Sequence, residues 1–414
     1  MDEVSSLVST TEAVVVVDST TTSSVHPPPS SQCIYEAPEA LNERFLLVTG
    51  LGSAVAVCSL IENVFLTFML LRRKSHRSSH LLYLGLLAAC DALIAVAYLP
   101  LMSANLLADK LQSPQILEAW FHYMIPMITI SHIAMTASTF LIVAATVERY
   151  ILTEYPQRSS SLNRTRLRIA IVALVFGVIS KFSMANELEV DQVPACVGTM
   201  VEYQLKLSDL AQQPLYNSLW RFFFRTFVTV YLPFFVLAIL NARIVVVIQR
   251  NDFLSHFDLT DHKRKLRIRE ATRTLVLVVC TYLVSNVLNV VVTIWEYLDN
   301  EGLINNHRTF YMYAVDVVSI LTVFAGTLRL PILLVCQGQL RREMRLFCRS
   351  ACTGIQVYEK ASLSMPVEIV HMKEDEGDCG TRLLHSRNSS LEKEEQHDLS
   401  NTHRNICNES LKSS

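Results

Sequence analysis

Apolar residues gather in seven stretches of the chain, separated by shorter polar segments. A bilayer core about 30 Å thick needs about twenty helical residues, because each residue adds 1.5 Å. Each stretch is about that long, so the pattern predicts an all-α membrane protein built as a seven-transmembrane helix bundle. The predicted spans are 45–71, 81–106, 119–151, 167–184, 219–247, 271–295 and 310–336.

The segments outside these spans predict three parts. Residues 1–44 are rich in Ser, Thr and Val and lack the basic head and apolar core of a signal peptide, which predicts a disordered tail. Residues 340–347 form an amphipathic run, which predicts a short eighth helix along the membrane surface. The helical domain is therefore expected to cover 45–352, and the polar residues 353–414 to form a second disordered tail.

Composition excludes several classes of protein. The chain is 51% hydrophobic and 18% charged, which is too apolar for a soluble domain of this length and predicts a lipid environment. A net charge of −2 gives no overall basic surface for nucleic acid. No group of side chains has the spacing of a metal site, a cofactor site or a catalytic set, so no enzyme is predicted.

Charged residues differ between alternate loops. Basic residues mark the cytoplasmic side of a membrane protein, because they resist translocation. The connections after the first, third and fifth spans carry them: Arg72, Arg73, Lys74, Arg77, Arg158, Arg164, Arg166, Arg168, Arg250, Lys263, Arg264, Lys265, Arg267 and Arg269. The other loops are acidic. We therefore predict a multi-pass plasma-membrane protein with an external N-terminus and a cytoplasmic C-terminus.

A triplet at the inner end of the third span, Glu148-Arg149-Tyr150, is followed by Pro156. It resembles the Asp/Glu-Arg-Tyr signature of the rhodopsin family of G-protein-coupled receptors. Further positions match the family in the expected order: Asn63, Asp91, Pro100, Ser138, Pro233 and Pro331. The resemblance covers roughly 45–352 and implies a receptor for an extracellular ligand that activates a heterotrimeric G protein.

The resemblance also implies a set of switch residues: Glu148, Arg149, Tyr150, Asn241, Tyr282 and Pro331. In such a triplet the carboxylate can hold the neighbouring guanidinium until helix motion frees it. The family's Cys-Trp-x-Pro motif is replaced by residues 285–288, Ser-Asn-Val-Leu. We therefore expect Tyr282 to be the aromatic pivot, and no proline kink in the sixth span.

A buried polar core is expected from Asn63, Asp91, Ser138, Arg329 and Glu62. An unpaired cation at membrane depth costs at least about 2.5 kcal/mol, so Arg329 needs a carboxylate partner, either Asp91 or Glu62. In related receptors the residues matching Asp91 and Ser138 help to bind a sodium ion. One hypothesis is that Arg329 substitutes for this ion. The alternative is that Arg329 faces elsewhere and a sodium site persists.

The cysteines depart from the family pattern. The family's cysteine at the outer end of the third span is replaced by Met124, so the usual bridge to the second outer loop cannot form. Cys196 is expected in that loop, and Cys33 is the other external cysteine. We predict a Cys33–Cys196 disulfide, with two free thiols as the alternative.

Certain short motifs look like those of invertebrate FMRFamide-like neuropeptide receptors: Lys181-Phe182, Glu187, Glu189, Trp295-Glu296 and Leu328-Arg329-Leu330-Pro331. Ligands of that subfamily end in an arginine and an amidated aromatic residue. An acidic outer face concentrates such cations, although each acid can equally be a solvated loop charge. The predicted pocket residues are Trp120, Tyr123, Ser131, His132, Glu187, Asp191 and, most of all, Glu296. Ser131 stands where amine receptors carry an aspartate.

Cys348 and Cys352 follow a basic run and are candidate palmitoylation sites, with inert thiols as the alternative. Ser386, Ser389 and Ser390 are candidate phosphorylation sites for arrestin recruitment. Two other functions are alternatives to a peptide receptor. A small-molecule chemosensory receptor is disfavoured by the acidic face, and a transporter is disfavoured because the halves show no repeat.

Overall fold

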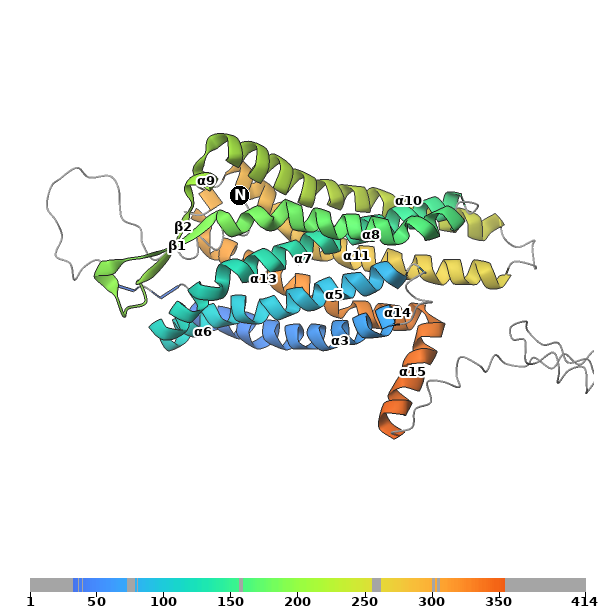
Figure 1. The fold of residues 1–414 in the computed structure, drawn as a ribbon, viewed down its shortest axis with the longest axis horizontal. Coiled ribbons are helices and arrows are strands. Elements are labelled where there is room, and N and C mark those ends of the chain that lie inside the picture. Colours follow the sequence, from blue (N-terminus) through green and yellow to red (C-terminus); the bar gives the residue numbers. More distant parts are fainter. Residues whose placement is uncertain are drawn as a thin grey trace, which may run out of the picture. The chain divides into compact units, whose positions relative to one another are not determined.

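The computed structural model describes residues 33–35, 37–38, 40–72, 79, 81–155, 159–254, 262–299, 302–303 and 306–353. Within these ranges, seven helical segments are long and apolar enough to cross a bilayer. They pack as a helix bundle (Figure 1), which confirms the predicted seven-transmembrane bundle. The segments are Leu41–Arg72, Leu81–Leu111, Pro114–Glu154, Thr165–Asn186, Tyr216–Arg250, Arg269–Leu298 and Arg308–Cys336.

Several of these segments contain more than one helical element. The first comprises α2 (Leu41–Arg44), η2 (Phe45–Gly52) and α3 (Ser53–Arg72), and the second α5 (Leu81–Tyr98), η3 (Leu99–Ser103) and α6 (Ala104–Leu111). The third is α7 (Pro114–Glu154), and the fourth joins α8 (Ser159–Lys181) to η5 (Phe182–Asn186). The remaining bundle elements are α9 (Asp209–Gln212), η7 (Tyr216–Tyr231), α10 (Leu232–Leu254), α11 (His262–Leu298), α13 (Arg308–Thr327) and α14 (Arg329–Cys336).

Prolines account for part of this segmentation. Proline has no backbone N–H and clashes with the carbonyl one turn earlier, so a helix widens or bends near it. Pro100 lies inside the π-helical turn η3, and Pro233 follows the π-helical segment η7. The sixth segment contains no proline within α11, which runs as one helix from His262 to Leu298.

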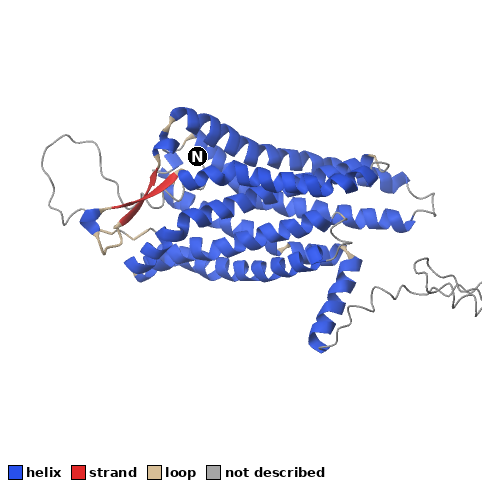
Figure 2. Ribbon diagram, in the orientation of Figure 1, coloured by secondary structure: helices blue, strands red, loops and turns tan. Residues whose placement is uncertain are grey.

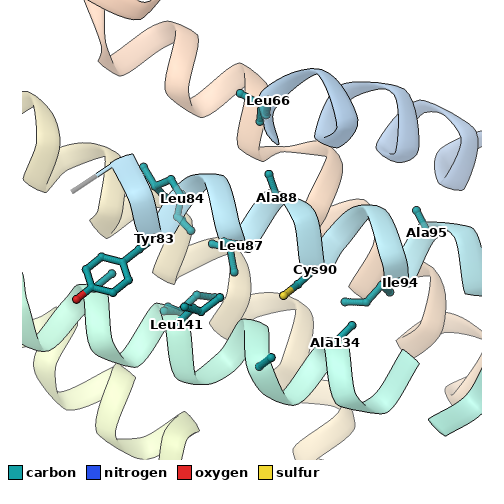
Figure 3. Packing of buried hydrophobic residues seen from close by; sticks show 14 of the residues in the cluster. Leu66, Tyr83, Leu84, Leu87, Ala88, Cys90, Ile94, Ala95, Ala134 and Leu141 are labelled. Carbon is teal, nitrogen blue, oxygen red and sulfur yellow. The ribbon is translucent and has the colours of Figure 1, made fainter. Parts of the chain in front are cut away.

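Apolar side chains from neighbouring helices fill the centre of the bundle. Leu87 on α5 and Leu141 on α7 meet there in one buried cluster (Figure 3). Small residues let the helices approach closely, as is usual in membranes. On α8, a Cβ atom added to Gly177 would lie only 2.8 Å from the Cβ of Ala137 on α7. A larger side chain at Gly177 would therefore force these two helices apart.

A β-hairpin lies at one end of the bundle (Figure 2). Strand β1 (Leu188–Gln192) pairs antiparallel with β2 (Tyr203–Leu207), with Val190 opposite Leu205. Leu188 and Leu205 are buried in a cluster with residues of α7. The sequence predicts only an acidic loop here, because the alternation of apolar and polar residues in two strands of five residues is too short to be recognised. We call this end the hairpin end.

The opposite end carries Glu148-Arg149-Tyr150, and we call it the ERY end. Arg149 lies on α7 roughly 40 Å beyond Trp120 at 1.5 Å per residue. Trp120 itself belongs to the cluster that covers the hairpin. A ligand at the hairpin end and a partner at the ERY end would therefore act on one continuous helix.

The chain ends differ in part from the prediction. The first helical segment begins at Leu41, inside the expected tail, and Arg44 is buried. After α14 the helix α15 (Gly338–Thr353) is longer than the predicted run 340–347. Cys348 and Cys352 lie on α15, and their side chains are outside the described residues. The predicted disorder of 1–32 and 354–414, Pro156 and the tail serines also lie outside them.

Candidate functional site

A cavity opens among the helices toward the hairpin end, and the space inside its outline, part of which is open to solvent, is about 1070 Å³. Its lining comes from the segment before α2 and from α2, α5, η3, α6, α7 and α13: Pro38, Arg44, Ile94, Tyr98, Leu101, Met102, Asn105, Leu106, Asp109, Ile128, Ser131, His132, Met135, Met312, Val315, Asp316, Ser319, Thr322 and Val323. Ser131 and His132 are thus the two predicted pocket residues that line it.

An ion pair inside this cavity joins α2 to α13. The Arg44 Nε donates to Asp316 Oδ2 at 2.6 Å, and Nη2 donates to Oδ1 at 3.1 Å. Two parallel bonds of this kind fix the planes of both groups. Neither residue was predicted. Arg44 was assigned to a disordered tail, and the signal that it belongs to the bundle is its position directly before the apolar run at Phe45.

A second carboxylate, Asp109 on α6, lines the same cavity. Tyr35 Oη donates to Asp109 Oδ1 at 3.0 Å. Burial and then the charge of Asp109 raise the pKa of Tyr35 above its ordinary value, so the phenol keeps its proton and donates. The segment before α2 is thereby held against α6, beside the pocket.

The same segment is held at its start by a disulfide. Cys33 is bonded to Cys196, with 5.5 Å between their Cα atoms. Cys196 lies in the connection between β1 and β2, within the short helix η6 (Pro194–Cys196). Met124, which replaces the family's usual cysteine on α7, is fully buried. The structure therefore ties the hairpin to the segment before α2 instead of to α7.

Replacing Cys33 by Ser is expected to lower stability by about 2–4 kcal/mol, because the crosslink closes a long loop in the unfolded chain. The measurement is thermal unfolding of the purified receptor. Reducing agent should produce the same loss in the unsubstituted protein and no further loss in Cys33→Ser. An equal effect of reductant on both proteins would contradict the prediction.

The predicted aromatic residues of the pocket have a different place. Trp120 is 1% exposed, and its Nε1 donates to the Leu101 carbonyl at 3.0 Å. Tyr123 Oη donates to the Pro100 carbonyl at 3.1 Å. Both carbonyls belong to the π-helical turn η3, where the regular helix ladder is interrupted. Neither residue is among those that line the larger cavity.

The acidic loop residues are also engaged elsewhere. Glu187 is 1% exposed and accepts bonds from Arg225 Nη1 at 2.6 Å and Tyr216 Oη at 2.7 Å, with Arg221 Nε 3.4 Å away. Burial opposes its ionisation, but these partners more than offset it, so the pKa of Glu187 lies below its ordinary value. Asp191 on β1 pairs with Lys206 on β2. Neither carboxylate lines the larger cavity.

Glu296, the acid expected first in the pocket, is buried on α11. It accepts a hydrogen bond from Tyr311 Oη on α13 at 2.9 Å. The residue lines a smaller cavity of about 270 Å³ with Asn289, Val292, Thr293, Tyr311, Val315 and Val318. Val315 also lines the larger cavity, so the two spaces are neighbours on α13.

At the ERY end, Glu148 has a different partner from the one expected. Arg166 on α8 donates from Nε to both carboxylate oxygens of Glu148 at 3.0 Å. The expected pair with Arg149 does not form in the described part of the chain. Adjacent residues on a helix point in different directions, so α8 supplies the guanidinium that faces Glu148. Arg149 and Arg166 are both buried.

Two other predicted switch residues, Tyr282 and Asn241, contact neighbouring helices. Among the described residues, no side-chain hydrogen bond joins Tyr150 or Pro331 to another helix. Tyr282 on α11 lies 3.2 Å from Thr139 Oγ1 on α7, at hydrogen-bonding distance. Asn241 Nδ2 on α10 lies 3.2 Å from Cys280 Sγ on α11. Rotation of α11 would therefore change contacts with both α7 and α10.

The buried polar core lies between the cavity and the ERY end. Arg329 pairs with Asp91 and also donates from Nη1 to the Leu87 carbonyl at 3.2 Å. Asn63 Nδ2 donates to the Gly326 carbonyl at 3.3 Å. Of the two carboxylates considered for Arg329, Asp91 is the partner and Glu62 is not. Ser138 is buried on α7, and within the described residues no hydrogen bond joins it to Asp91.

The comparison with known families agrees with this arrangement. A family model described as 7 transmembrane receptor (rhodopsin family) matches residues 62–328, well over half of the chain. The chain belongs to the rhodopsin family of seven-transmembrane receptors. It is therefore a G-protein-coupled receptor with an extracellular ligand, and neither an enzyme nor a transporter. No curated protein matches the chain. The matched range ends just before Arg329 and Pro331, where the sequence departs from the family motif.

Proposed function

We propose that this receptor is activated by an extracellular, cationic, amidated neuropeptide of the FMRFamide-like type. The main support for this proposal is the net charge of the side chains that line the larger cavity. Two carboxylates, Asp109 and Asp316, line it against one guanidinium, Arg44. These three side chains together leave one negative charge among the described lining residues. A desolvated site with that charge favours a ligand that carries a positive group.

The orientation in the membrane is part of the proposal. The hairpin end faces the outside and the ERY end faces the cytoplasm of a multi-pass plasma-membrane protein. The basic connections after the first, third and fifth spans support this direction, because cytoplasmic loops carry an excess of Lys and Arg. The disulfide supports it too, since such bonds persist in the oxidising extracellular compartment.

The cytoplasmic partners follow from this orientation. Arg149 is proposed to contact the heterotrimeric G protein when the helices move, as in the family that the chain belongs to. Cys348 and Cys352 on α15 are proposed palmitoylation sites beside the basic residues Arg341, Arg342 and Arg345. Ser386, Ser389 and Ser390 are proposed phosphorylation sites for arrestin.

The test is a calcium or cyclic-nucleotide assay in cells that express the receptor, challenged with a library of amidated peptides. We expect a response to peptides with an arginine before an amidated aromatic residue. Arg149→Ala should lose most of the response, a change of roughly 5–150-fold, because coupling free energies between two sites have that size. Surface expression and peptide binding should stay close to those of the unsubstituted receptor.

Arg243→Ala is the matched control, because Arg243 is an exposed arginine on α10. Its response should equal that of the unsubstituted receptor. Silence of the expressed receptor toward the whole library would reject the peptide proposal. In that case a library of small organic odorants and metabolites is the next challenge, since a chemosensory receptor is the competing function.

A further inference from the structure

Arg44 places a positive charge inside a cavity that two carboxylates also line. It pairs with one of these carboxylates, that of Asp316. Both carboxylate oxygens of Asp316 accept from its guanidinium, at 2.6 and 3.1 Å. Arg44 is 8% exposed and Asp316 is buried. Both side chains nevertheless line the cavity, so a ligand that enters it reaches this pair.

Two further contacts lie near this pair. Next to Arg44 on α2, Glu43 Oε2 accepts from Tyr313 Oη on α13 at 2.6 Å. Asp109 also lines the cavity, with Tyr35 as its donor. Asp316 thus binds a planar guanidinium. Most of the other side chains that line the cavity are apolar.

We infer that Arg44 occupies the subsite for the basic group of the ligand, and that a guanidinium on the ligand exchanges with Arg44 on Asp316. This inference rests on the proposed function, since it names the subsite that a cationic peptide uses. It makes Arg44 a built-in competitor that lowers the affinity of the receptor for cations.

Exchange explains how a buried carboxylate can serve a ligand. Removing a charge from water without a partner costs several kcal/mol, so a buried Asp316 without a bound cation would destabilise the free receptor. With Arg44 bound, the Asp316 carboxylate is already desolvated and paired. The guanidinium of the ligand then takes the place of the Arg44 guanidinium. A bidentate carboxylate selects guanidinium over ammonium, because only the planar fork forms both bonds.

The exchange would also reach the rest of the receptor. Arg44 lies on α2, and the segment before it is tied to the hairpin by Cys33–Cys196. Release of Arg44 removes the ion pair between the first and the seventh membrane segments. Val323 lines the cavity one helical turn before Gly326, whose carbonyl accepts from Asn63 in the polar core. Motion of α13 at Asp316 therefore acts on a helix that contacts that core.

The experiment measures binding of argininamide to the purified full-length receptor in lipid nanodiscs. Citrullinamide is the uncharged probe of similar shape. Arg44→Gln should bind argininamide at least about tenfold more tightly than the unsubstituted receptor, within the usual range of coupling between sites. The double variant Arg44→Gln/Asp316→Asn should lose this gain, and citrullinamide should show none. If Arg44→Gln does not fold, Arg44→Lys should give a smaller gain in the same direction.

Two controls separate exchange from simpler effects. Lys110→Gln removes one positive charge from an exposed site on α6 and tests general electrostatics. Tyr313→Phe removes the neighbouring contact between α2 and α13 without changing charge. Both should bind argininamide as the unsubstituted receptor does. An equal gain in either control, or no gain in Arg44→Gln and Arg44→Lys, would overturn the inference.

The outcomes also distinguish this inference from the proposed function. A gain for argininamide in a receptor that no amidated peptide activates would keep the subsite and reject the peptide ligand. Activation by peptides, with argininamide binding that Arg44→Gln leaves unchanged, would keep the peptide ligand and reject the exchange.

Discussion

Replacing Asp91 by Asn should destabilise this receptor by about 3–5 kcal/mol, because removal of one partner leaves the other charge buried and unpaired. The charge left behind is that of Arg329, which the structure pairs with Asp91 between α5 and α14. Thermal unfolding in nanodiscs measures the loss. Asp91→Asn/Arg329→Gln should recover most of it, since the double variant leaves no buried charge at this place.

The same pair predicts how the receptor responds to sodium. Related receptors bind a sodium ion near the residues that match Asp91 and Ser138. We propose that the Arg329 guanidinium takes the place of this ion. The unsubstituted receptor should then unfold at the same temperature in sodium chloride and in choline chloride. Arg329→Gln should become more stable in sodium, because a ligand of the folded state stabilises it by mass action. Sodium dependence of the unsubstituted receptor would refute this substitution.

Glu187→Gln is expected to have an effect of similar size, again about 3–5 kcal/mol in thermal unfolding. Glu187 joins the start of the hairpin to η7, where Arg225 is 0% exposed. Neutralising the carboxylate removes the negative charge that Glu187 supplies to the buried guanidiniums of Arg225 and Arg221.

Asp191→Asn is the matched control for Glu187→Gln. It removes a carboxylate from the same hairpin, but the pair with Lys206 is about half exposed and should contribute less than about 1 kcal/mol. Equal stability of the two variants would show that the Glu187 cluster is not structural. A loss of peptide affinity in Glu187→Gln, with stability unchanged, would return Glu187 to the ligand site.

The seven spans could be predicted from sequence because the requirement is local. Each helix must satisfy its own backbone hydrogen bonds in lipid and present about twenty apolar residues, and both properties are readable along one segment. The polar positions Asn63, Asp91 and Arg149 were recognisable because they match, in order, the polar residues of the rhodopsin family. A polar side chain at membrane depth is costly enough to stand out from the apolar residues around it.

The choice of partners was not predictable, because it depends on which side chains face one another across the bundle. The sequence indicated the adjacent Arg149 as the partner of Glu148, whereas the packing of α8 on α7 selects Arg166. The sequence position of Trp120 is compatible with a place in the pocket. Only the structure shows that its indole N–H donates to a carbonyl of the π-helical turn η3.

The sequence by itself therefore determined the helix bundle and its membrane environment, because apolar length acts within one helix, and its resemblance to the rhodopsin family indicated the candidate switch residues. Only the tertiary structure decided the ligand cavity, where Arg44 and Asp316, 272 residues apart, become partners. Such a pair leaves no periodic or compositional trace in either segment. Its energy arises only when folding removes both charges from water and brings them together.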